Sequence, residues 1–142
     1  MNPKALTRIL QIKERQRQIK RSELADADKS LDEAARHFDA ASDLGQRAAG
    51  ALIDDGEVGA GELAMRARLA GLAQRELAAA RSRLREREAE REACGEQVVA
   101  ATQEVRVFEH LTDRALREQE RAKGLREQIE LDELSARKRE PK

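Results

Sequence analysis

The chain has 142 residues, of which 39% are charged and only 1% are aromatic, and its 28 basic and 28 acidic residues give a formal net charge of zero. This composition excludes an ordinary globular core, which needs many large apolar side chains, and it is typical of a long helix or coiled coil. Disorder is the alternative for so charged a chain, but the periodic apolar positions described next argue against it.

The first predicted helix covers residues 3–54. Asn2 followed by Pro3 is a typical helix start, because Asn accepts a hydrogen bond from an unpaired backbone N–H and Pro is tolerated at the first helical position. Apolar residues then recur in alternating steps of three and four, at Leu24, Ala27, Leu31, Ala34, Phe38 and Ala41. This spacing predicts a coiled-coil seam, with a break in its phase between Ile19 and Leu24.

The glycines Gly56, Gly59 and Gly61 mark a break, so we expect a turn over residues 55–60 and a second helix over 61–139. The seam spacing resumes at Ala70, Ala73, Leu77, Ala80, Leu84, Cys94, Val98, Ala101, Val105 and Phe108, with Arg87 and Arg91 in the two slots between Leu84 and Cys94. Continuing through Leu111 and Ala115 requires two successive steps of three, which predicts a second phase break.

A short connection makes two helices antiparallel neighbours, so we predict an all-α fold: one domain over residues 1–142, built as a long two-helix antiparallel coiled-coil hairpin. With the turn centred near residue 57, Phe38 should lie near residue 76 and Leu6 near Phe108. Leu31 and Leu77 should be buried in the seam.

In this register the first helix has no residues left to pair with the second helix beyond about residue 110. The result is an overhanging C-terminal helix with apolar residues at Leu125, Ile129, Leu131 and Leu134. An isolated helix with apolar side chains is marginal in water and normally docks on something. Two occupants stay open: the overhang of a second copy, or a different protein. Because the second helix fills the seam of the first, we expect a monomer.

The residues that carry chemistry are sparse. The stretch GEVGAGEL is not a phosphate loop, because no Lys-Ser/Thr follows it and its glutamates would repel phosphate. His37 and His110 lack ligand-spaced partners, and the lone Cys94 is expected to be a small seam residue of a protein in a reducing cytoplasm. We therefore expect no enzyme activity, no cofactor and no metal.

Nucleic acid and membrane insertion are also disfavoured as partners. Glutamates balance the arginine-rich stretch RSRLRERE, and no aromatic platform exists on which bases could stack. No apolar run approaches the roughly 18 residues that a membrane-spanning helix needs.

Two segments resemble the FliJ/YscO family of type III export systems. The stretch EQIELDELSAR is similar to the terminal FliJ pattern, which places Gln128, Asp132, Glu133, Leu134 and Arg137 ahead of the basic end RKREPK. The start LTRILQIKERQRQIKRSEL is similar to the family's first helix, with a Leu-containing seam and a Lys/Arg-Glu cluster. The resemblance covers the whole chain in architecture and few residues in detail.

The resemblance implies a cytoplasmic stalk-like protein, peripheral to the inner-membrane export apparatus. Its open end would bind the hexameric export ATPase through Gln128, Leu131, Asp132, Glu133, Leu134, Arg137, Arg8, Lys13 and Arg15. Its turn region would reach the export-gate membrane protein and export chaperones through Leu44, Leu52, Leu69 and Leu72. The chain lacks the aromatics of flagellar members near the turn, which favours an injectisome member. The alternative function is a free coiled-coil adaptor or escort for export chaperones without an ATPase role.

Overall fold

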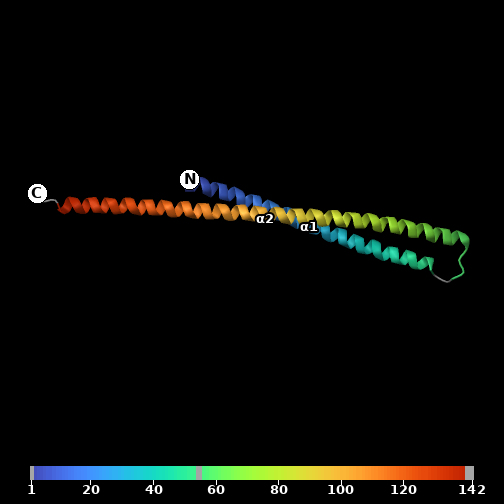
Figure 1. The fold of residues 1–142 in the computed structure, drawn as a ribbon. Coiled ribbons are helices and arrows are strands. Elements are labelled where there is room, and N and C mark those ends of the chain that lie inside the picture. The colour runs from blue at the N-terminus through green and yellow to red at the C-terminus, as the bar shows by residue number, and fades with distance from the viewer. Residues whose placement is uncertain (1, 54–55, 140–142) are drawn as a thin grey trace. The chain divides into compact units, whose positions relative to one another are not determined.

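The computed structural model describes residues 2–53 and 56–139, and two long helices account for nearly all of them (Figure 1). Helix α1 spans Pro3–Leu52 and helix α2 spans Ala60–Arg139. Within these ranges there is no strand, and the two helices pack against each other, which confirms the predicted all-α hairpin.

The ends of the helices lie close to the predicted ones. Asn2 caps α1, because its Oδ1 accepts a hydrogen bond from the Lys4 backbone N–H with an N–O distance of 3.0 Å. Helix α1 ends two residues before the expected residue 54, and α2 begins at Ala60, one residue before the expected residue 61. The turn residues 54–55 and the last three residues of the basic end, 140–142, lie outside the described residues.

The contacts group into two compact units, each made of one segment from each helix. The first unit combines residues 2–19 with 99–139, and the second covers residues 20–98. In the first unit, the Lys13 Nζ lies 3.0 Å from Glu104 Oε2 and 5.9 Å from the centroid of the Phe108 ring. Lys13 therefore lies level with residues 104–108 of α2.

Cross-helix contacts in the second unit show the antiparallel direction. Arg91 Nε donates a 2.9 Å hydrogen bond to Asp28 Oδ1, and His37 Nε2 lies 3.1 Å from Glu76 Oε1. Residue numbers rise along α1 as they fall along α2. The contact at Glu76 also confirms the predicted pairing of Phe38 near residue 76.

The predicted seam matches the positions that the structure removes from solvent. In α1 the less exposed positions that keep the 3-4 spacing are Leu6, Leu10, Lys13, Arg17, Lys20, Leu24, Ala27, Leu31, Ala34, Phe38, Ala41, Gly45 and Ala48. In α2 they are Arg66, Ala70, Ala73, Leu77, Ala80, Leu84, Cys94, Val98, Ala101, Val105, Phe108, Thr112 and Ala115. Arg87 and Arg91 occupy the intervening slots and stay exposed, and both guanidinium groups are paired with carboxylates, of Glu90 and Asp28 respectively.

Both predicted phase breaks are wrong. In α2 the seam continues from Phe108 to Thr112, which is 7% exposed, while Leu111 is 37% exposed. The Thr112 hydroxyl is satisfied inside the seam because Oγ1 donates a 2.6 Å hydrogen bond to the Phe108 carbonyl. In α1 the seam runs through Lys13, Arg17 and Lys20, whose long aliphatic stems can cover small apolar neighbours.

Two further expectations need correction. Leu31 and Leu77 are half-buried rather than buried, because a two-helix seam rich in alanine covers large side chains on one side only. Lys13, not Leu6, lies over the Phe108 ring. Leu6 precedes Lys13 by one heptad and so lies level with Thr112, about one helical turn from its predicted partner.

Gly45 offers a test of how closely the helices approach. A Cβ added there would lie 3.9 Å from Leu77 Cδ2, which is ordinary van der Waals contact. Gly45→Ala should therefore raise the free energy of unfolding by about 0.5–1 kcal/mol through helix propensity. Chemical denaturation followed by circular dichroism measures the change, and a loss of stability would show that α1 and α2 lie closer at this point than described.

Candidate interaction surfaces

The C-terminal part of α2 is exposed at every residue from 116 to 139, and we call this segment the overhang. Beyond Leu116, which is 44% exposed, its large apolar side chains are Leu125, Ile129, Leu131 and Leu134, and these are between 53% and 63% exposed. Large apolar side chains that stay exposed on a helix without a packing partner favour docking of that helix on another molecule.

These four residues lie on two opposite sides of the helix. Ile129 is two and three heptads beyond the seam residues Ala115 and Phe108, so it continues the face on which α1 packs. Leu125 lies one turn before Ile129 on that side. Leu131 is two residues after Ile129, about 200° around the helix, and Leu134 follows it at i+3. We call the two sides the seam strip (Leu125 and Ile129) and the outer strip (Leu131 and Leu134).

A second surface lies near the turn, in the unit formed by residues 20–98. It is an open groove between α1 and α2 with a volume of about 620 Å³, lined by Leu44, Arg47, Ala48, Ala51, Arg66, Leu69, Leu72, Ala73 and Glu76. Its three leucines are between 53% and 62% exposed. We call this surface the turn groove. Apolar side chains from two neighbouring antiparallel helices form a groove into which a third amphipathic helix could pack.

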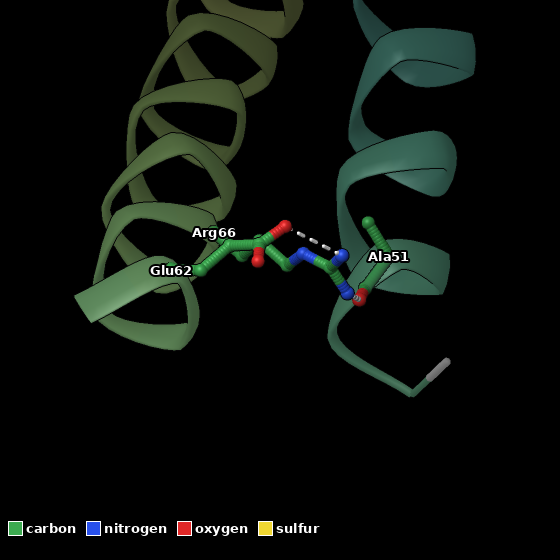
Figure 2. Close-up of polar contacts among 3 residues, drawn as sticks. All are labelled: Ala51, Glu62 and Arg66. Atoms are coloured by element: carbon green, nitrogen blue, oxygen red, sulfur yellow. Dashed lines mark hydrogen bonds and ion pairs between the residues drawn. The ribbon is translucent and has the colours of Figure 1, made fainter. Parts of the chain in front are cut away.

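Arg66 joins the two helices at the end of the turn groove (Figure 2). It donates a 3.0 Å hydrogen bond from Nη1 to the carbonyl of Ala51 and another 3.0 Å bond from Nη2 to Glu62 Oε1. Ala51 lies in the last turn of α1, whose carbonyls have no partner within the helix and carry the negative end of the helix dipole. Arg66 therefore ties the groove wall together and places a positive charge at its end.

The predicted ATPase-binding residues do not come together as one site. Six of them lie on the overhang: Gln128, Leu131, Asp132, Glu133, Leu134 and Arg137. Lys13 is half-buried and bound to Glu104, while Arg8 and Arg15 are exposed on α1. Because Lys13 lies level with residues 104–108, Arg8 is about 18 residues along α2 from Gln128, or roughly 27 Å.

Three of the four residues predicted to face the gate or chaperones do share a site. Leu44, Leu69 and Leu72 line the turn groove, whereas Leu52 is exposed outside its lining. Sequence reasoning missed Arg47, Arg66 and Glu76, which supply the polar rim. The sequence does indicate where the groove lies, because each of the three leucines directly precedes a seam residue. Apolar residues beside a seam widen the apolar face of a helix and mark a second packing surface.

Among residues 2–53 and 56–139, no three His, Cys, Asp or Glu side chains are grouped so that they could hold a metal ion. Neither described helix contains a stretch long and apolar enough to cross a bilayer. Cys94 is half-buried in the seam, and His37 is engaged with Glu76.

Comparison with known proteins does not assign the chain to a family. No family model, curated protein or solved structure matches it.

Proposed function

We propose that the protein is a stalk-like component of a type III export apparatus, cytoplasmic and peripheral to the inner membrane, that binds a hexameric export ATPase through the overhang. The observation that carries the proposal is the exposed outer strip on a helical segment without intrachain packing, at the place where the sequence resembles the FliJ/YscO terminal pattern. The strip is flanked by Asp132, Glu133 and Arg137, which could fix its register by charge-assisted hydrogen bonds.

The proposed mechanism follows from symmetry. A single helix with different residues on each side cannot offer the same contact to six identical subunits around it. The subunit that meets Leu131 and Leu134 would be stabilised in a conformation that the other five do not share. The protein would thereby promote ring assembly or sequential hydrolysis without hydrolysing ATP itself.

The turn groove gives the proposal its second contact. We propose that it receives an apolar segment of the export-gate membrane protein or of an export chaperone. Leu44, Leu69 and Leu72 supply the apolar floor, and Arg47, Arg66 and Glu76 supply the polar rim. The groove also favours the second candidate function, a chaperone adaptor or escort without an ATPase role, because a helix-binding cradle needs no ring.

The deciding experiment combines binding with turnover. The purified chain is added to the export ATPase of the same organism, association is measured by pull-down, and ATP hydrolysis is measured as a function of chain concentration. Association with a rise in hydrolysis that saturates supports the stalk function. Absence of both, together with capture of an export chaperone, supports the adaptor function instead.

A further inference from the structure

The seam strip continues the face of α2 on which α1 packs, but it lies beyond the start of α1. Helix α1 begins at Pro3, which lies level with Ala115 of α2 if the register at Leu6 and Thr112 is carried one step further. Beyond that point the seam positions of α2 are Gln119, Ala122, Arg126, Ile129, Glu133 and Ala136, and all of them are exposed. The first turns of α1 still lie beside Leu116 and Gln119, because Asn2, Pro3 and Thr7 line one pocket with them. An antiparallel helix could therefore take the place of α1 from residue 120 onward.

We infer that this helix is the same segment of a second copy of the chain. In an antiparallel pair with Arg126 opposite Ile129 of the second copy, residue 120 of one copy lies opposite residue 135 of the other. The two overhangs then overlap over residues 120–135, the part that lies beyond the start of α1. Leu125 and Ile129 of the two copies meet at the centre, where they would form one apolar cluster.

This register brings opposite charges together, in the same arrangement as one ion pair between α1 and α2. Within the chain, the seam residue Arg91 binds Asp28, which directly follows the seam residue Ala27 of the opposite helix. In the pair of overhangs, Arg126 would meet Glu130, which directly follows Ile129 of the second copy. Two-fold symmetry creates that contact twice.

The next layer repeats the pattern with the signs exchanged. Glu133 lies opposite Ala122 of the second copy, and Lys123 directly follows that alanine. Four charge contacts therefore surround the central apolar cluster. The two Arg126 side chains lie only three residues apart along the pair, because each is opposite Ile129 of the other copy, and this approach of like charges limits the affinity and makes the dimer dependent on concentration. This pairing does not depend on the proposed ATPase function.

The test is sedimentation equilibrium of the full chain from about 5 to about 500 µM, a range that detects a weak dimer. We expect the monomer predicted from the sequence at the low end of this range and a dimer at the high end. Arg126→Glu should raise the dimer dissociation constant roughly tenfold, because it turns two attractive contacts into repulsive ones. Arg126→Glu combined with Glu130→Arg should restore dimerisation, since the contacts re-form with exchanged partners.

Matched variants separate the pairing from a general effect of charge. Arg117→Glu makes the same charge change outside the seam positions and should leave the dimer intact. Leu125→Asp with Ile129→Asp should abolish it, while helicity measured by circular dichroism confirms that the hairpin persists. A parent chain that is monomeric over the whole range, or a dimer that the Arg126 and Glu130 double exchange fails to restore, overturns the inference.

Discussion

Replacing both Leu131 and Leu134 with Asp is expected to abolish binding and stimulation of the export ATPase without lowering the melting temperature of the hairpin. Both side chains are more than half exposed on a segment without packing against α1, so the hairpin loses no buried contact. The partner, in contrast, would have to bury two carboxylates in an apolar contact, which is costly unless they are paired.

The control variant comes from the other side of the same helix. Leu125→Asp with Ile129→Asp introduces the same number of charges into the overhang but leaves the outer strip intact, so ATPase binding should persist. Thermal melting and pull-down are measured for both double variants. If the Leu131 and Leu134 variant melts well below the parent, these leucines belong to a core and the overhang has been misjudged. If it stimulates the ATPase fully, the outer strip is not the contact.

Val105→Ala should destabilise the unit formed by residues 2–19 and 99–139 by about 2 kcal/mol. Val105 is 0% exposed, and removing two buried methyl groups costs about 0.8 kcal/mol each, to which the residual cavity adds. Val107→Ala is the matched control, because Val107 is 55% exposed on the same helix and should change stability by less than about 0.5 kcal/mol.

Native-state hydrogen exchange is the appropriate measurement, since it resolves the amides of this unit from those of residues 20–98. Amides near Val105 and Leu6 should exchange faster in Val105→Ala and at the parental rate in Val107→Ala. Equal exchange in the two variants would mean that Val105 is not a packing residue of the seam.

The fold was predictable because the heptad spacing is local and regular. The alternating spacing of three and four residues, together with one turn, was enough to predict the seam from Leu24 to Ala41 in α1 and from Ala70 to Ala80 in α2. The rule failed where residue type and position disagreed. Leu111 is more apolar than Thr112, yet Thr112 takes the seam position because it lies four residues after Phe108, and its hydroxyl is tolerated there because it donates a hydrogen bond to the Phe108 carbonyl. A pattern search that counts only apolar residues misses this.

The surfaces were predictable in part. The overhang follows from the unequal lengths of the two helices, and three of the predicted turn-region residues, Leu44, Leu69 and Leu72, line the turn groove. The division of the overhang into two strips was missed because four apolar residues lie within ten positions of the sequence. Only their angular positions around the helix axis separate them into two sides. The polar rim of the turn groove was missed because Arg66 acts through the Ala51 carbonyl, a backbone group that sequence patterns do not show.

The overhang should also make the unbound chain sensitive to proteolysis. A helical segment without tertiary contacts is held only by its own backbone hydrogen bonds and side-chain pairs, so it opens turn by turn rather than with the hairpin. The arginines and lysines along it are then within reach of proteases that require extended substrates. Any partner that covers the segment would protect it. The abundance of such a partner would then set how much full-length protein persists, and chain made in excess would be trimmed to a hairpin that can no longer engage it.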